Sequence, residues 1–337
     1  MILLWIEFLI CSAVIVYCGA NLSRYGDVIA EKTGLGRAWI GLILMSGVTS
    51  LPELITGISS VAFADAPDIA MGDVMGSCVF NLSLIALMDM LHGPHPIFSK
   101  AEHSHILSAG FGAILMGIAV LSIASGTALP AIGHISIATP VIVGFYALSM
   151  RSVFLFQKRQ VAEHIGEIAP ELQYGSITTR EAAIKYGLNA LVIVIAASWL
   201  PFIGDRLAEV TGLGRSFVGS ILIAMTTSLP ELVVSITALR IGAADMAIAN
   251  LMGSNLFNMV ILGIDDMAYA KGALFSAVSQ NHAITGTIAV IMTGIVIVSL
   301  MYRLEKKTVL RIGWDALALA LAYLVNIALL YSLRGRG

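Results

Sequence analysis

The stretch TSLPEL occurs twice, at Thr49–Leu54 and again at Thr227–Leu232, each time within a long apolar run. Proline interrupts a helix, because its ring removes a backbone N–H and clashes with the preceding turn. A carboxylate is costly in hydrocarbon, by about 2.5–3.5 kcal/mol at the centre of a membrane-spanning helix. The repetition of both features in the same order therefore asks for a structural or a functional reason.

The composition is that of a membrane protein. Of the 337 residues, 58% are hydrophobic and 12% are charged, with a mean hydropathy of +0.91, whereas about a quarter of the residues of a soluble domain are charged. The formal net charge of −2 gives no support to nucleic-acid binding, which usually needs a basic surface. The first apolar stretch has no basic residue before Arg24, so we interpret it as a retained span rather than a cleaved signal peptide.

About ten stretches have the roughly 20 mostly apolar residues that a spanning helix needs. They are 2–22, 38–64, 69–91, 104–128, 130–150, 184–204, 214–240, 246–267, 281–302 and 312–333. The only long polar connection is 151–180. We therefore expect a first five-helix repeat at 1–150, a linker at 151–180 and a second five-helix repeat at 181–337.

The basic residues predict an orientation. Assigning the 19 Lys and Arg residues to alternate sides puts 14 on the side of the linker and 5 on the other. The positive-inside rule then places the linker in the cytoplasm and both termini outside a cell (inner) membrane.

The two halves are related in sequence. TGLGRAWIGLILMSGVTSLPELITGISS from Thr33 matches TGLGRSFVGSILIAMTTSLPELVVSITA from Thr211, and GDVMGSCVFNL from Gly72 matches ANLMGSNLFNM from Ala249. Five spans is an odd number, so the second copy crosses the membrane in the opposite sense. Inverted repeats of this kind are an architecture of secondary transporters, whose sites lie near the midplane between the repeats. The predicted fold is all-α, with two inverted repeats of five helices broken at the midplane.

The motif itself has two readings. Ser50 precedes Glu53 by three residues, as Ser228 precedes Glu231, which is the spacing of a capping box with proline in the first turn. The purely structural reading is a span that breaks and restarts under this cap. A cap contributes roughly 1 kcal/mol, which does not offset the cost of the charge. A bound cation could offset it.

The following span in each half supplies further polar groups. Ser77 and Asn81 are four residues apart, as are Ser254 and Asn258, so each pair lies on one helix face. Asp73 extends the first face by one turn. The neighbouring glycines also fit simple close packing of helices, but packing does not explain the repeated asparagine.

Together the two halves offer hard oxygen donors, and 6–8 such ligands suit Ca²⁺. The cluster contains no His or Cys, which argues against Zn²⁺ or Cu⁺. Two carboxylates balance one divalent cation or two monovalent cations, as exchange on a shared site requires.

TSLPEL followed by GSxxxN, present in both halves, resembles the repeats of the cation/Ca²⁺ exchanger superfamily, and the similarity is closest to prokaryotic Na⁺/Ca²⁺ exchangers. The resemblance implies that Glu53 and Glu231 are the central ligands. It adds Thr49, Ser50, Ser77, Asn81, Thr227, Ser228, Ser254 and Asn258, with main-chain oxygens near Ser46 and Ala224. It also implies two short gating helices that slide against the core, here the first and sixth spans.

Three positions depart from the family pattern. Relatives can have Asp where this chain has Asn258, Asp73 stands opposite Asn250 in the second copy, and Cys78 stands opposite Asn255. The extra carboxylate of Asp73 makes it a further candidate metal ligand and leaves the coupling ion open between Na⁺ and H⁺.

The expected function is a secondary antiporter, not an enzyme, that exchanges Na⁺ for Ca²⁺ by alternating access, without a cofactor and as a monomer. H⁺/Ca²⁺ exchange is the alternative. A channel is disfavoured because channels usually build their rings by oligomer symmetry, and a hydrolase is disfavoured because no H-E-x-x-H motif occurs.

Several charged residues lie near the predicted span ends. His92, His95, His103 and His105 are expected to lie in a solvated loop. Asp89, Asp265 and Asp266 are expected to face water. Asp65 and Asp68 are candidates for attracting cations at the outer mouth.

Overall fold

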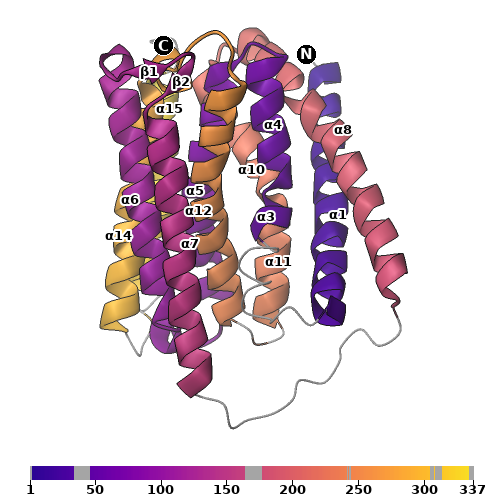
Figure 1. The fold of residues 1–337 in the computed structure, drawn as a ribbon, viewed down its shortest axis with the longest axis vertical. Helices are drawn as coiled ribbons and strands as arrows, with labels where there is room; N and C mark the ends of the chain where they lie inside the picture. The colour runs from indigo at the N-terminus through magenta and orange to yellow at the C-terminus, as the bar shows by residue number, and fades with distance from the viewer. Residues whose placement is uncertain are drawn as a thin grey trace.

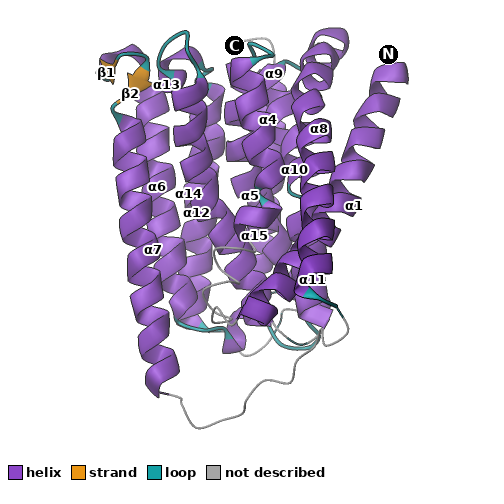
Figure 2. Cartoon of the chain, turned by 45° about the vertical axis from the view of Figure 1, so that its right-hand side comes forward, coloured by secondary structure: helices purple, strands orange, loops and turns teal. Residues whose placement is uncertain are grey.

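The computed structural model describes residues 2–33, 46–163, 177–240, 242, 244–303, 307 and 313–333. Nearly all of this is helix, apart from a minimal two-stranded hairpin at one end of the bundle (Figure 2). The prediction of an all-α membrane fold is confirmed.

The first half contains five long or broken helical segments. They are α1 (Ile2–Thr33), α3 (Ser46–Thr49) with α4 (Leu51–Ala62), α5 (Pro67–Leu91), α6 (Ser104–Ser125) and α7 (Ala138–Glu163). Short elements lie between them: η2 (Ile97–Lys100), η3 (Gly126–Ala128), β1 (Ala131–Ile132) and β2 (Ile135–Ser136), the two strands pairing antiparallel.

The second half repeats this order. It has α8 (Thr179–Thr211), α9 (Arg215–Phe217), η4 (Val218–Ile223), α10 (Ala224–Thr227), α11 (Leu229–Arg240), α12 (Ala244–Ala268), α13 (Leu274–Ala277), α14 (Asn281–Tyr302) and α15 (Trp314–Leu333). In the described part of the chain, eight helices are long and apolar enough to cross a membrane, and the bent pair 215–227 and 229–240 makes a ninth. The predicted span 38–64 lies partly outside the described residues; its second part is α3 and α4.

The fifth predicted span, 130–150, is shifted in the structure, where α7 begins at Ala138. The preceding residues turn back on themselves, with the N–H of Ile137 donating to the carbonyl of Pro130 at 3.1 Å. The helix also continues past Arg151 to Glu163. Hydropathy marks the apolar part of a helix rather than its end, because a polar helix can continue into water.

The two halves run in opposite directions through the bundle (Figure 1). Both described chain ends lie at the same end of the molecule, which we call the termini end, and α7 and α8 approach the connection between the halves at the opposite end, the linker end. From the middle, α4 runs to the termini end, whereas α11 runs to the linker end. The central helices α5 and α12 are antiparallel.

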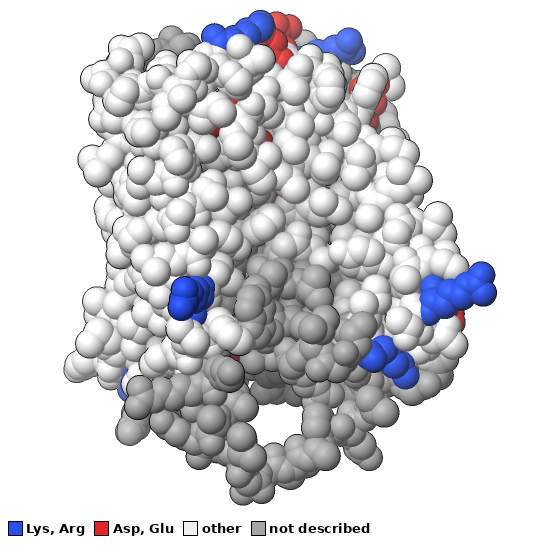
Figure 3. Space-filling model, viewed as in Figure 1, with Lys and Arg blue, Asp and Glu red and all other residues white. Residues whose placement is uncertain are grey.

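On the face that Figure 3 shows, a broad band of the described surface between the two ends of the bundle carries almost no charged side chain. Large apolar side chains are exposed along the long helices, among them Leu9, Leu188 and Leu321, each more than half exposed. Soluble monomers rarely expose apolar patches of this extent. The band therefore matches the hydrocarbon of a bilayer.

The buried apolar side chains form two separate clusters. The larger one fills the space among α5, α6, α7, α12, α14 and α15. The smaller one lies mainly between α1 and α8, and reaches α5 and η4. These two helices have 32 and 33 residues, so the expectation of short gating helices is wrong in length: they are among the longest helices described.

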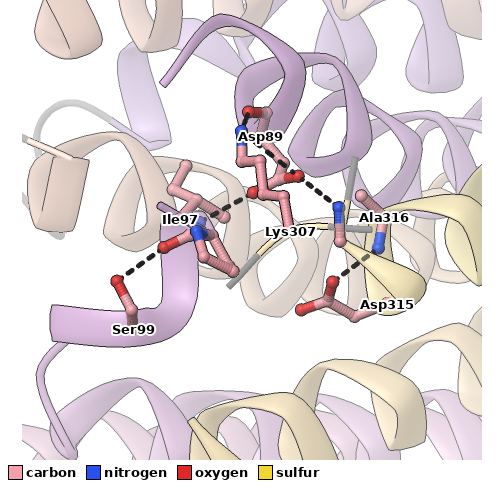
Figure 4. A network of polar contacts seen from close by, with 8 residues as sticks. Asp89, Ile97, Ser99, Lys307, Asp315 and Ala316 are labelled. Atoms are coloured by element: carbon pink, nitrogen blue, oxygen red, sulfur yellow. Dashed lines mark hydrogen bonds and ion pairs between the residues drawn. The ribbon is translucent and has the colours of Figure 1, made fainter. Parts of the chain in front are cut away.

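Asp89, Asp265 and Asp266 do not face water as expected; all three are buried. Asp89 accepts hydrogen bonds from the N–H groups of Ile97 at 2.7 Å and Gly313 at 2.9 Å, and Lys307 Nζ lies 3.6 Å from its Oδ2 (Figure 4). At the other end of the bundle, Asp266 accepts from the N–H of Leu274 at 2.7 Å. Each carboxylate thus holds the N–H eight residues later in the chain, so the pair is a pseudo-symmetric loop anchor.

A second pair of anchors joins the halves. Asp68 accepts a 3.0 Å bond from His282, and Asp245 lies 2.9 Å from His105. Both histidines are buried, so His105 does not belong to a solvated loop. Asp65 pairs with Lys271 at 2.7 Å. The acids expected to attract cations at the mouth are therefore already engaged by cationic or imidazole partners.

Candidate cation-binding site

Both copies of the motif break their helix at the serine. Ser50 separates α3 from α4, and Ser228 separates α10 from α11, where the helix axis bends by 43°. Pro52 lies in the first turn of α4, and the Ser50 side chain makes no capping bond to its own helix. The capping-box reading of the motif is therefore wrong for Ser50, although the helix break itself is as predicted.

Each of these serines instead reaches the glutamate of the other half. Ser50 Oγ donates to Glu231 Oε1 at 3.2 Å, and Ser228 Oγ donates to Glu53 Oε1 at 2.8 Å. All four residues are buried, with no exposed surface. The two motifs, 178 residues apart in sequence, therefore form one polar centre.

The central helices complete the same pattern within each half. Ser77 on α5 donates to Glu53 Oε1 at 3.4 Å, and Ser254 on α12 donates to Glu231 Oε1 at 3.3 Å. Each glutamate thus accepts two serine hydroxyls on one oxygen, one from each half. This fixes the carboxylate and leaves its second oxygen free for another partner.

The asparagines are held through their amide nitrogens. Asn81 Nδ2 donates to Asn255 Oδ1 at 3.1 Å, Asn255 Nδ2 donates to the Cys78 carbonyl at 3.2 Å, and Asn258 Nδ2 lies 3.8 Å from Cys78 Sγ. Because the nitrogens are engaged, the side-chain oxygens of Asn81 and Asn258 remain available. Asn255 is the residue that sequence reasoning noted only as the counterpart of Cys78; the structure makes it the bridge between α12 and α5.

The kinks also present main-chain oxygens. Thr49 donates to the Ser46 carbonyl at 3.3 Å, and Thr227 is 3.2 Å from the Ala224 carbonyl, which Ser77 also approaches at 3.4 Å. The structure therefore places both carbonyls expected from the sequence beside the hydroxyls of the centre.

Asp73 joins the centre from α5. Its Oδ1 accepts a 2.7 Å bond from Thr227 of the other half, and the side chain is fully buried. Its counterpart Asn250 donates instead to Ser235 at 3.2 Å. The two halves therefore differ by one buried charge next to the shared centre.

On the two glutamates and the two asparagines of this centre, four buried oxygens have no hydrogen-bond partner: Glu53 Oε2, Glu231 Oε2, Asn81 Oδ1 and Asn258 Oδ1. Buried carboxylates are costly unless paired, and no ion pair among the described residues involves Glu53, Glu231 or Asp73. Two carboxylate and two amide oxygens are hard ligands of the type that Ca²⁺ and Na⁺ take. The arrangement can hold a desolvated cation.

All thirteen residues expected from the sequence belong to this region and are buried. Sequence reasoning missed Asn255 and the buried Asp265 on α12. The signal for Asn255 was its place one residue after Ser254; for Asp265, its position seven residues after Asn258 on one helix face.

These features define a class: a helical membrane protein with inverted repeats and a buried oxygen-lined site shared between them. A family model described as sodium/calcium exchanger protein matches residues 3–155 and 185–332. The chain belongs to this family, and is an exchanger rather than an enzyme.

Individual relatives agree with this assignment. The chain is 26% identical to the inner membrane protein YrbG of Escherichia coli over 76% of this chain and 80% of that protein. It is 23% identical to the sodium/calcium exchanger MaX1 of Methanosarcina acetivorans over 91% of this chain and 93% of that protein. A solved structure of the sodium-calcium exchanger NCX_Mj, soaked with Na⁺ and Sr²⁺, aligns with a TM-score of 0.63 at 19% identity, covering 97% of this chain and 99% of that one. The last comparison shows a shared fold.

Proposed function

We propose that this chain is a Na⁺/Ca²⁺ antiporter in which both ions use the centre between the two TSLPEL motifs in turn. The observation that carries the proposal is the set of four unpartnered buried oxygens on Glu53, Glu231, Asn81 and Asn258. Two carboxylates are neutralised by one Ca²⁺ or by two Na⁺. Loading with either ion therefore offsets the same electrostatic cost, which is the condition for exchange on one site. The relative MaX1 is named a sodium/calcium exchanger, which supports Na⁺ and Ca²⁺ as the two transported ions.

The ligand set would comprise both glutamates and both asparagines, assisted by the hydroxyls of Thr49, Ser50, Ser77, Thr227, Ser228 and Ser254 and the carbonyls of Ser46 and Ala224. The serines bind the other carboxylate oxygen of each glutamate and so position it. Asp73 adds a third carboxylate at the edge of this set.

Alternating access would come from the movement of α1 and α8 against the rest of the bundle. Two contacts support this. These helices share a hydrophobic cluster separate from the main core, and α1 passes close to the motif of the second half, where a Cβ on Gly19 would be 2.5 Å from Pro230 Cγ. Because Gly19 lets α1 lie directly against the kinked motif, a small slide of α1 along the bundle can expose or cover that motif.

For the organisation in the membrane we propose two repeats, 1–150 and 181–337, joined by a cytoplasmic linker at 151–180, with both termini outside. The excess of basic residues on the linker side supports this orientation. We further propose that the protein lies in the cell's inner membrane and works as a monomer, because the pseudo-symmetric site is completed within one chain.

The test is ⁴⁵Ca²⁺ uptake into proteoliposomes loaded with Na⁺ and diluted into Na⁺-free buffer, with a parallel set energised by a pH gradient alone. Uptake that requires the Na⁺ gradient and ignores the pH gradient supports the proposal. Uptake driven only by the pH gradient would replace it with H⁺/Ca²⁺ exchange, an alternative that the extra carboxylate of Asp73 favours. A steady Ca²⁺ current without any counter-ion gradient would indicate a channel.

A further inference from the structure

The buried carboxylate of Asp265 has a setting unlike that of any other acid in the described chain. It has no exposed surface, and neither of its oxygens has a hydrogen-bond partner. The adjacent Asp266 differs, since its carboxylate accepts from the N–H groups of Ser136 and Leu274 and from the Thr139 hydroxyl. Asp266 is thus explained as a loop anchor, whereas Asp265 is not explained by folding.

Asp265 lies on the termini side of the central site. On α12 it follows Asn258 by seven residues, or two turns on the same face. A helical side chain leans toward the N-terminus of its helix, which for α12 is back toward the centre. The carboxylate packs against Gly57 of α4, where an added Cβ would be 2.5 Å from Asp265 Oδ1 and 2.8 Å from its Cγ. Gly57 is itself one turn beyond Glu53.

A second carboxylate with a free oxygen is at the same level. Asp73 is one turn from Ser77 toward the termini end, and its Oδ2 has no partner. Asp73 precedes Ser77 by four residues and Gly57 follows Glu53 by four, so Asp73 and the glycine that Asp265 contacts both lie one turn from the central site toward the termini end. Three unpartnered carboxylate oxygens therefore lie next to the central site on one side of it: Asp73 Oδ2, Asp265 Oδ1 and Asp265 Oδ2.

The pseudo-symmetry shows that this acidity is an addition on one side. In the register of the repeats, Asp73 corresponds to Asn250, Gly57 to Ser235 and Asp265 to Met88. At the linker end, Asn250 donates to Ser235 at 3.2 Å and Met88 is a buried apolar side chain. Packing at the linker end therefore needs neither acid, and at the termini end the smaller Gly57 makes the room that the Asp265 carboxylate occupies.

We propose that Asp73 and Asp265 form an additional binding site for a monovalent cation, Na⁺, between the termini end and the central site. Unpaired carboxylates are costly in a protein interior, and one Na⁺ held between the two offsets one of their two negative charges while it attracts both carboxylates. A Na⁺ ion here would lie between the termini end and the centre, one turn from Glu53, and the two carboxylates would raise the local cation concentration beside the central site. The inference rests on the proposed function for its role in exchange, but not for the existence of the site.

Binding to the purified protein tests the site without transport. The variant E53Q/E231Q removes both central carboxylates, and equilibrium binding of ²²Na⁺ is then measured by scintillation proximity with N-methyl-D-glucamine as the balancing cation. We expect this variant to retain saturable Na⁺ binding and the further change D265N to weaken it by roughly tenfold or more. D65N is the matched control, because it removes a charge at the same end from an exposed pair with Lys271. Binding that is absent from E53Q/E231Q, or unchanged by D265N, overturns the proposal.

A second variant guards against misfolding. G57S/D73N/D265M copies the residues that this chain uses at the corresponding linker-end positions, and should be monodisperse in gel filtration while losing the same Na⁺ binding. In Na⁺/Ca²⁺ exchange, D265N should reduce the apparent Na⁺ affinity on the termini side by roughly tenfold and leave that on the linker side unchanged. A lack of Na⁺-driven Ca²⁺ uptake by the unmodified protein would refute the proposed function, whereas the binding result alone decides the site.

Discussion

Ser228, in the kink between α10 and α11, donates a 2.8 Å hydrogen bond to Glu53 of the other half. Ser50 donates the symmetry-related hydrogen bond to Glu231 at 3.2 Å. The serine of each motif therefore donates its hydrogen bond to the glutamate of the other motif and does not cap its own helix. This exchange of partners is what makes one site out of two repeats.

The first prediction concerns the carboxylates. E53Q and E231Q should each abolish Ca²⁺ transport, because either change halves the charge that neutralises a divalent ion. The measurement is ⁴⁵Ca²⁺ uptake, with gel filtration to establish that the variants fold. D65N, an exposed carboxylate outside the site, should transport normally. Transport retained by either glutamine variant would mean that the TSLPEL motif has a structural role and does not supply an essential ligand.

The serine bonds predict an asymmetry between the halves. The Ser228–Glu53 bond is shorter than the Ser50–Glu231 bond, and a hydrogen bond to a charged group contributes about 1.5–3 kcal/mol. S228A should therefore reduce apparent Ca²⁺ affinity by roughly ten- to a hundred-fold, and S50A by less. S228T keeps the hydroxyl and should restore affinity. Equal effects of S228A and S228T would mean that side-chain volume, not the hydroxyl, matters there.

Close packing beside the site gives a stability prediction. A Cβ on Gly76 would be 2.6 Å from the Ser220 Cα and 2.7 Å from its carbonyl carbon, and backbone atoms cannot move aside as a flexible side chain can. G76A should destabilise the protein by about 1–3 kcal/mol through overpacking, lowering the midpoint of thermal unfolding in detergent. G110A, at a position on α6 with no atom within 4 Å of the new methyl group, should leave the midpoint unchanged or raise it.

The buried aspartates that anchor the loops give a second prediction about stability. Asp266 accepts three hydrogen bonds in a buried setting, and each buried donor left without a partner costs about 1–3 kcal/mol. D266A should therefore unfold at a clearly lower temperature than the unmodified protein. D65A is the control, because its exposed ion pair with Lys271 is worth about 0–1 kcal/mol. A D266A midpoint no lower than that of D65A would contradict the anchoring role.

The contact of α1 with Pro230 tests the sliding proposal. G19A introduces a methyl group 2.5 Å from Pro230 Cγ, and should slow turnover by hindering the movement of α1 while leaving equilibrium ⁴⁵Ca²⁺ binding intact. G187A, at an open position on α8, should do neither. A loss of binding that equals the loss of turnover would mean that Gly19 shapes the site and does not permit movement.

Much of the fold could be predicted from the sequence because it depends on local sequence patterns. Apolar runs of spanning length, proline in TSLPEL and the match between the two copies each depend on neighbouring residues alone. Hydropathy failed where a helix leaves the membrane, as at Arg151 in α7, because polar residues can continue a helix in water. It also failed for Asp89 and Asp266, since a carboxylate near a span end is equally compatible with water and with a buried cluster of N–H donors.

The sequence by itself determined that Glu53 and Glu231 occur in equivalent broken helices of inverted repeats, since periodicity, proline and repetition are properties of the chain. Only the tertiary structure decided which serine binds which glutamate, that Asn255 bridges to Cys78, and that Asp265 faces Gly57 without a partner. Those relations depend on packing between helices up to about 200 residues apart in sequence. Burial is set by what packs against a side chain, and no local pattern records it.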